Sequence, residues 1–381
     1  MFRRLSALLF ALGLFGAELS AASLDRAMKD VERLRGVTFT GGVKQRTVDR
    51  ADLPKLLREQ IAKSLPYSID DYVRILRTLQ LVDPKTPDVL GQMLNLYQSQ
   101  VLAFYDPHAH VYYAIRELPA MAKEAGSAEM LQEAIAVHEL THALQDQRFH
   151  AGEREEKLRR DTDAEMAYHA LVEGEASLVM TAWMLEKAGQ SLDEAMKSPT
   201  ALDWLTDATV GDKFVDPDTP RYFTESLKFP YFNGMKLVVE GYKRGGWKMI
   251  DRMHANPPRS TTEILNLDAY FARLDAPSSP APSFDSRADN ALTVEHLGEF
   301  HWRFLAGDTV RGWVDDRVIV TRGGSVLAET RWENAERAAA FRDGYVAFLK
   351  TRGVEPRAAL DGNRVRVAYG PESSAIATFM Q

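Results

Sequence analysis

The segment from Val137 to Asp146 constrains this chain more strongly than any other, because it contains the pattern H-E-x-x-H. On an α-helix, residues four apart lie on the same face, one turn above the other. His138 and His142 can therefore offer their imidazole nitrogens to a single metal ion. Glu139 projects at an adjacent angle, from which its carboxylate can reach a water molecule in an open coordination position. The segment thus predicts a helix that carries a metal site.

This spacing suits hydrolysis, since zinc lowers the pKa of a bound water molecule to about 7 and a neighbouring carboxylate can then take the proton. The helix is predicted from about Ser127 to Phe149, and apolar residues occur around most of its circumference. A helix that is hydrophobic on nearly all sides is a buried one. A buried setting favours a functional motif, because a chance H-E-x-x-H on a surface helix would have polar neighbours.

A second long helical pattern, from Thr162 to about Ala188, contains the candidate for a third metal ligand. It is largely apolar but includes Glu173-Gly174-Glu175. Glycine inside a helix costs about 1 kcal/mol relative to alanine, and an unpaired buried charge is expensive. A bound cation explains both features, since Gly174 permits close helix approach and one carboxylate faces the metal. Glu173 and Glu175 lie on different faces of the helix, so only one of the two is expected to contact the metal. A salt bridge is the alternative for Glu173.

The run His138-Glu139-Leu140-Thr141-His142, followed by Glu173-Gly174-Glu175-Ala176, resembles the gluzincin metallopeptidases. In the aminopeptidase pattern of that superfamily, the third zinc ligand is the first glutamate of an E-G-x-A run, which corresponds to Glu173. The resemblance implies that zinc is bound by His138, His142 and Glu173, that Glu139 is the general base, and that the substrate is a peptide or protein. Another gluzincin pattern has an aspartate four residues after the ligand glutamate, where this chain has Ser177.

The chain is also similar to a group of exported, largely uncharacterised bacterial and archaeal metallopeptidases within this superfamily. The similarity extends over roughly residues 50–270. It is carried by four motifs, namely F-Y-D-P at Phe104–Pro107, H-E-L-T-H-A-L-Q-D-Q at His138–Gln147, L-V-E-G-E-A at Leu171–Ala176 and P-P-x-S-T at Pro257–Thr261. After the last motif the group usually continues E-Q-I-L-H-P, whereas this chain reads T-E-I-L-N-L.

The residues from Val101 to Ile115 predict a β-hairpin, because two β-rich runs flank Asp-Pro and polar residues. In gluzincins an edge strand just upstream of the zinc helix binds the substrate main chain by β-addition. The resemblance therefore implies substrate binding by Val111, Tyr112, Tyr113 and Ala114, with a plain core strand as the alternative. His108 and His110, near the hairpin tip, are expected to be solvated turn residues rather than a metal pair.

Peptide hydrolysis also needs a hydrogen-bond donor for the developing oxyanion beside the metal. Four residues downstream of Glu173 could supply it, and each also suits a structural role: Tyr222, Tyr231, His254 and Arg259. Three further residues are candidates for hydrogen bonding to the metal ligands: Asp146, one turn after His142, His169, one turn before Glu173, and Glu175.

The first 22 residues are predicted to be a signal peptide. Arg3 and Arg4 precede an apolar stretch from Leu5 to Ala17 that is too short to span a bilayer comfortably, and small residues follow at Ser20–Ala22. We therefore expect cleavage after residue 21 or 22 and export to the periplasm or medium, with an uncleaved anchor as the alternative. The chain has no cysteine, which excludes disulfides and lipoprotein attachment. No later segment is apolar for long enough to cross a membrane.

The predicted fold class is α+β. Residues 23–275 are expected to form a mainly helical, gluzincin-like core with a small edge-exposed sheet. A Pro/Ser-rich linker at 276–288 leads to a small α+β domain of unknown role at 289–381. In that domain we expect helices at 294–306 and 335–351, a hairpin around Gly323-Gly324 and a strand at 363–369. The charged segment 150–161 is expected to face solvent. The formal net charge of −7, without a basic block, argues against a nucleic-acid binder.

These features together predict an exported zinc metallopeptidase. The alternative is a catalytically inactive, zinc-binding envelope scaffold or binding protein with a gluzincin-derived core. The intact Glu139 favours catalysis, because a retired metal site has no need of a general base.

Overall fold

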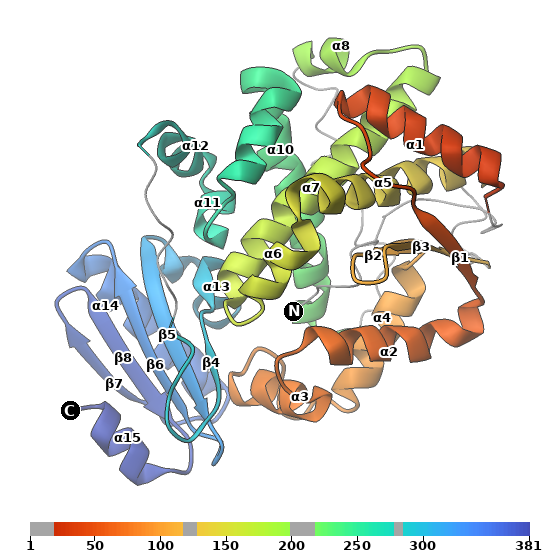
Figure 1. Ribbon diagram of the computed structural model, residues 1–381. Helices are drawn as coiled ribbons and strands as arrows, with labels where there is room; N and C mark the ends of the chain where they lie inside the picture. The colour runs from red at the N-terminus through yellow and green to blue at the C-terminus, as the bar shows by residue number, and fades with distance from the viewer. Residues whose placement is uncertain (1–18, 117–127, 199–217, 278–284) are drawn as a thin grey trace.

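The computed structural model describes residues 19–116, 128–198, 218–277 and 285–381. Within them the fold is α+β, with a mainly helical N-terminal part and a C-terminal part built on a five-stranded sheet (Figure 1). Most of the predicted signal peptide and residues 278–284 of the predicted linker lie outside the described residues. Among the described helices, none has the length and apolar character needed to cross a membrane.

The first elements are helices that begin at capping residues, and one short strand. Ser20 caps α1 and Ser68 caps α3 through their side-chain oxygens, because these accept otherwise unpaired backbone N–H groups. The elements are α1 (Ala21–Arg35), β1 (Lys44–Val48), α2 (Leu53–Ser64), α3 (Ile69–Thr78) and α4 (Val89–Gln100). Residues 37–43, between α1 and β1, belong to no helix or strand.

The predicted hairpin is present as β2 (Ala103–Asp106) and β3 (Val111–Ile115). The strand order is β1-β3-β2, with β1 parallel and β2 antiparallel to β3. The prediction that residues Val111 to Ala114 form a substrate-binding edge is therefore wrong. Both edges of β3 are already paired, so no further strand can add to it. The pairing with β1 joins segments more than sixty residues apart, which local sequence patterns do not encode.

Three long helices form the centre of the N-terminal part: α5 (Ala128–Phe149), α7 (Thr162–Lys187) and α10 (Arg221–Ala255). Helices α7 and α10 approach closely at two glycines. A Cβ atom added to Gly174 would lie 2.2 Å from the carbonyl oxygen of Gly234, and one added to Gly234 would lie 1.9 Å from that of Ala170. The expectation that Gly174 permits close helix approach is confirmed. Four short helices surround them: α6 (Ala151–Leu158), α8 (Leu192–Lys197), α11 (Thr261–Leu265) and α12 (Leu267–Asp275).

The C-terminal sheet is antiparallel, in the order β4-β5-β6-β8-β7. The expected hairpin, the helix at 335–351 and the last strand are present. The expected helix at 294–306 is wrong in its first part, because residues 291–295 form a strand and the helix begins only at Gly298, whose φ is +71°. The elements are β4 (Ala291–Glu295), α13 (Gly298–Ala306), β5 (Trp313–Thr321), β6 (Val326–Trp332), α14 (Ala335–Thr351), β7 (Arg357–Asp361), β8 (Arg364–Tyr369) and α15 (Ser373–Phe379).

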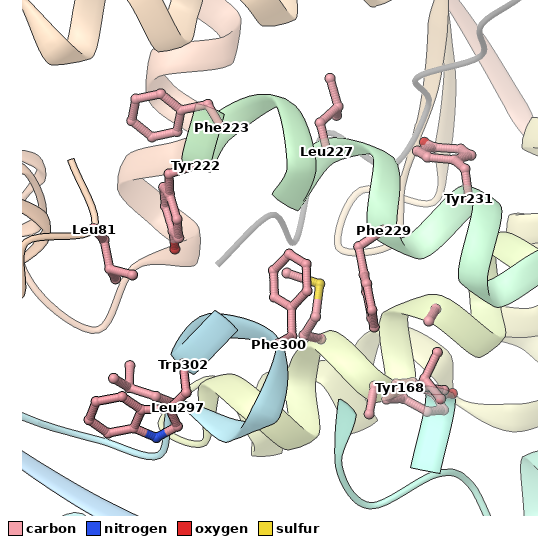
Figure 2. Close-up of a cluster of buried hydrophobic side chains, with 14 of the residues drawn as sticks. Leu81, Tyr168, Tyr222, Phe223, Leu227, Phe229, Tyr231, Leu297, Phe300 and Trp302 are labelled. Carbon is pink, nitrogen blue, oxygen red and sulfur yellow. The ribbon is translucent and has the colours of Figure 1, made fainter. Parts of the chain in front are cut away.

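The two parts share one hydrophobic core at the N-terminal end of α7. Phe300 of α13 packs on Phe229 of α10, with ring centroids 4.4 Å apart (Figure 2). Beside them, Thr261 donates its backbone N–H (2.9 Å) and its hydroxyl (2.5 Å) to buried Asp163 of α7. The Thr261 hydroxyl oxygen also accepts the N–H of Phe300 at 3.1 Å. The P-P-x-S-T motif therefore ends in a residue that ties α7 to the C-terminal part.

We predict that Thr261→Val lowers the free energy of unfolding by about 1–3 kcal/mol, because buried Asp163 and the N–H of Phe300 each lose a hydrogen bond. Chemical denaturation measures this change. Thr262→Val is the matched control, since the Thr262 hydroxyl is shielded from solvent and has no hydrogen-bond partner among the described residues. Equal effects of the two substitutions would contradict this role for Thr261.

Candidate metal centre

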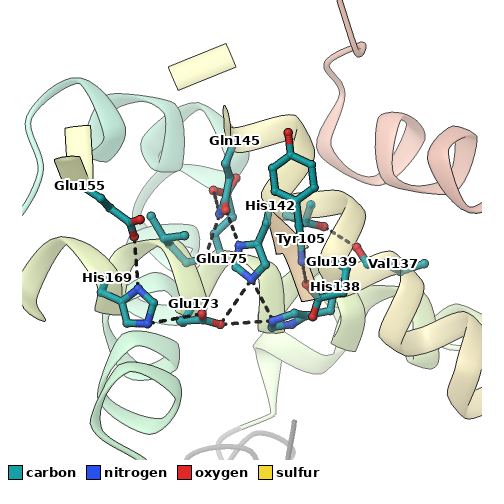
Figure 3. A network of polar contacts seen from close by, with 12 residues as sticks. Tyr105, Val137, His138, Glu139, His142, Gln145, Glu155, His169, Glu173 and Glu175 are labelled. Carbon is teal, nitrogen blue, oxygen red and sulfur yellow. Dashed lines mark hydrogen bonds and ion pairs between the residues drawn. The ribbon is translucent and has the colours of Figure 1, made fainter. Parts of the chain in front are cut away.

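Helices α5 and α7 bring three ligand atoms together in the core (Figure 3). The Nε2 atoms of His138 and His142 lie 3.1 Å apart. Glu173 Oε2 lies 3.2 Å from the first and 3.5 Å from the second. The side chains of His138 and Glu173 are fully buried and that of His142 is nearly so. Two residues one turn apart on α5 and one on α7 thus form a single compact group, as the sequence predicted.

The spacing of these three atoms fits a small cation. Ligands at about 2.0–2.1 Å from a tetrahedral zinc ion are separated from one another by about 3.4 Å. The three observed separations, 3.1, 3.2 and 3.5 Å, lie close to that value. Two imidazole nitrogens and one carboxylate oxygen are also a donor set typical of zinc and similar divalent ions. Burial alone would raise the pKa of Glu173, but His142 and His138 hold it well below its usual range, so the carboxylate is ionised.

A second histidine–carboxylate pair supports Glu173 from the other side. His169 Nε2 lies 3.5 Å from Glu173 Oε1, as expected for a residue one turn earlier on α7. His169 Nδ1 in turn lies 3.3 Å from Glu155 Oε1 (Figure 3). Glu155 belongs to α6 and is buried. The expectation that residues 150–161 face solvent is therefore wrong at this position, because α6 turns Glu155 toward α7.

Glu175 faces away from the three ligand atoms, into a separate buried polar cluster. Its Oε1 accepts a hydrogen bond from Arg35 Nε at 2.5 Å, and its Oε2 lies 2.5 Å from His254 Nε2. Burial alone would raise the pKa of Glu175, but Arg35 and His254 hold it well below its usual range. The choice that the sequence left open is thus decided by geometry in favour of Glu173. Arg35 comes from α1, and no sequence pattern links it to this site.

Gln145 joins this cluster to the metal ligands. Its Nε2 donates to the carbonyl oxygen of Val172 at 2.9 Å and to Glu175 Oε2 at 2.7 Å. Both amide hydrogens are therefore engaged, and the amide oxygen is left to face His142 Nδ1 at 2.9 Å. An acceptor in that position requires a proton on Nδ1, which leaves the Nε2 lone pair of His142 for a metal. Gln145 lies within the motif His138–Gln147, but local spacing does not indicate this role.

Glu139 lies in the same buried site but is held differently. Its Oε2 accepts the backbone N–H of Tyr105 in β2 at 2.8 Å. Its Oε1 is buried and has no hydrogen-bond partner among the described residues. Burial raises the pKa of Glu139 to about 8, with a further contribution from Glu173, although His142 and the Tyr105 amide oppose the shift. This carboxylate is therefore positioned by one oxygen and has the other available.

Asp146 does not contact a metal ligand in this structure, contrary to the sequence prediction. Its Oδ2 accepts the hydroxyl of Tyr105 at 3.1 Å and lies 3.1 Å from Nδ1 of His110, while Oδ1 accepts the N–H of Gly152 at 3.2 Å. Asp146 therefore ties the hairpin to α6. His110 is 68% exposed, and His108 is 45% exposed, so both are turn residues, as expected.

Of the four candidates for oxyanion binding, Tyr231 borders the ligand group. Its ring lies 6.3 Å from that of His138, with 23° between the planes. Tyr222 packs instead against Phe223 and Phe304. His254 pairs with Glu175, and Arg259 donates its backbone N–H to Glu263.

Comparison with known proteins gives one match, which concerns the C-terminal part alone. A family model described as a domain of unknown function, DUF8575, matches residues 287–379. Neither the curated proteins nor the solved structures contain a match. Residues 287–379 include the whole C-terminal sheet but none of the ligand group.

We predict that Glu173→Ala abolishes stoichiometric metal binding, whereas Glu175→Ala weakens it without abolishing it. The first substitution removes one of three ligand atoms, and the second removes no ligand atom but takes away the shared partner of Gln145, Arg35 and His254. Elemental analysis of the two purified variants after dialysis against equal zinc concentrations measures the difference. Greater metal loss in Glu175→Ala would instead assign the ligand role to Glu175.

Proposed function

We propose that this protein is a zinc metallopeptidase of the gluzincin type, which hydrolyses peptide bonds with Glu139 as general base. The observation that carries the proposal is the position of Glu139 beside three convergent ligand atoms. One of its carboxylate oxygens is held by the Tyr105 amide, and the other is buried with no hydrogen-bond partner among the described residues. A purely structural metal site gains nothing from a carboxylate held in this way.

His138, His142 and Glu173 are the residues that would hold zinc, with their donor atoms 3.1–3.5 Å apart. Bound zinc acidifies water and polarises a carbonyl group. Glu139 then accepts a proton from the attacking water as the new C–O bond forms. It delivers that proton to the amine nitrogen as the C–N bond breaks, so that protons balance over the turnover. The Tyr105 amide keeps the carboxylate in place for both transfers.

The substrate strand is assigned to β2 instead of β3. The N–H of Ile115 donates to the carbonyl oxygen of Leu102, and antiparallel pairing then directs the backbone groups of Phe104 toward β3. The backbone groups of Ala103 and Tyr105 therefore point to the opposite edge, where the Tyr105 amide meets Glu139. We propose that a peptide adds to this edge by pairing with Ala103 and with the Tyr105 carbonyl group, while the Tyr105 N–H stays on Glu139.

Export belongs to the same proposal and rests on the signal-like residues 1–22. Fractionation of cells that express the full chain, with detection of the mature N-terminus, tests it. Recovery of unprocessed protein in the cytoplasm would contradict it.

We predict that Glu139→Gln lowers the rate of hydrolysis of a mixed peptide library by at least about 100-fold while zinc stays bound, because general base catalysis is lost but no ligand is removed. Mass spectrometry of the library measures cleavage, and elemental analysis measures zinc. Wild-type protein treated with a chelator is the inactive control, and Glu153→Gln, on the exposed face of α6, is the matched charge control. Zinc-loaded wild-type protein that cleaves nothing would favour the inactive scaffold.

We predict that Tyr231→Phe lowers kcat by about 100- to 1,000-fold with little change in KM, because the Tyr231 hydroxyl is the proposed oxyanion donor. Tyr222→Phe removes a buried hydroxyl from the same helix, away from the ligand group, and should leave kcat unchanged. Steady-state kinetics on a peptide identified in the library compares the two. Equal kcat values would exclude Tyr231 as the donor.

A further inference from the structure

The N-terminal helix α1 sends one charged side chain into the interior of the protein. The side chain of Arg35, the last residue of α1, is fully buried, whereas Arg33, two residues earlier, is 53% exposed. Arg35 Nη2 donates to Asp251 Oδ1 at 2.7 Å, and its guanidinium lies 4.7 Å from the centre of the Trp247 ring. Its Nε donates to Glu175 Oε1 at 2.5 Å, which brings α1 into contact with α7 two residues beyond Glu173.

These contacts continue without interruption to a metal ligand. Arg35 holds one oxygen of Glu175, and the other oxygen accepts the amide of Gln145 at 2.7 Å. The amide oxygen of Gln145 then meets Nδ1 of His142 at 2.9 Å. The Glu175 carboxylate, together with the Val172 carbonyl, determines which way the Gln145 amide faces. The amide in turn determines which nitrogen of His142 carries a proton.

Attachment of α1 does not depend on Arg35. The apolar face of the helix is buried through Leu24, Ala27 and Val31. Asp30 accepts the indole N–H of Trp183 at 3.0 Å, and Arg33 pairs with Glu186 of α7 at 2.7 Å. A buried ion pair is also a weak source of stability, since removing two charges from water costs several kcal/mol per ion. The Arg35–Glu175 pair therefore serves to orient neighbouring side chains rather than to attach α1.

We propose that Arg35, acting through Glu175 and Gln145, is a positioning residue for the metal centre. It holds His142 in the tautomer with a proton on Nδ1 and presents Nε2 to the metal. Helix α1 is thereby part of the site, although it contributes no ligand. This inference rests on the proposed metal centre and goes beyond it. It assigns control of the His142 tautomer to Arg35, which lies more than a hundred positions before the H-E-x-x-H motif.

The test is a double-mutant cycle on zinc affinity with Arg35→Met and Gln145→Met, measured by competition with a chromogenic chelator. We expect each single variant to weaken zinc binding by about 10- to 100-fold, as is typical when a group that orients a ligand is lost. The double variant should bind zinc as tightly as the weaker-binding single variant, because both substitutions interrupt the same series of hydrogen bonds. Arg33→Met, on the exposed face of the same helix, should stay within about twofold of wild type.

Denaturation of the metal-free proteins separates positioning from folding. If Arg35→Met does not fold, Arg35→Lys takes its place in the cycle, because it keeps the buried positive charge but removes the Nε–H that donates to Glu175. Long-range ¹H–¹⁵N spectra of the zinc-loaded wild type should place the His142 proton on Nδ1.

Zinc affinities within about threefold of wild type, or additive losses in the double variant, would overturn the positioning role while leaving the metal centre standing. Absence of zinc binding by the wild type would overturn both. Peptide hydrolysis plays no part in either readout, so a failure of the proposed catalysis is distinguished from a failure of this inference.

Discussion

The interaction on which the rest of the structure depends is the convergence of two imidazoles and a carboxylate in a fully buried position. Such a group is unfavourable unless each member has a partner that fixes its charge and direction. The protein provides these partners as two series of interacting side chains. Gln145, Glu175 and Arg35 lie behind His142, and His169 and Glu155 lie behind Glu173. Helices α5 and α7 supply the three ligand atoms, and α1 and α6 contribute side chains that support them.

Helix packing brings these elements into contact. Gly174 and Gly234 allow α7 and α10 to approach until the backbone of one meets the Cα of the other. That approach places Tyr231 of α10 beside His138, whereas His254, which meets Glu175, lies beyond a kink at Gly245 and Gly246 of α10. The two glycines thus lower the local helix propensity, but they permit the close packing that gives the site its geometry.

The C-terminal part packs near the N-terminal end of α7, the helix that carries Glu173. Thr261 hydrogen-bonds to Asp163 and Phe300, and the aromatic core passes from α10 to α13 without a break. Residues 287–379, which match the domain of unknown function, are therefore packed against the helix that carries Glu173. The position of that helix depends on both parts of the chain, because each contributes to its burial.

Local features were readable from the sequence by itself. The two histidines one turn apart, the apolar helices around them, the capping serines and the hairpin all follow from spacing and from residue type, which act over a few residues. Gly174 could be recognised as a packing position for the same reason. The expected helix at 294–306 is wrong in its first part because residues 291–295 pair with β5, and local sequence patterns do not encode that pairing.

Tertiary structure alone decided which partner each side chain meets. Whether Glu173 or Glu175 meets the two histidines depends on how α7 is rotated against α5, and β3 is a central strand only because distant β1 pairs with it. The roles of Arg35 and Glu155 depend on where α1 and α6 pack. These are contacts between residues far apart in the chain, and periodicity carries no information about them, because it specifies the face of an element and not the neighbour against which that face packs.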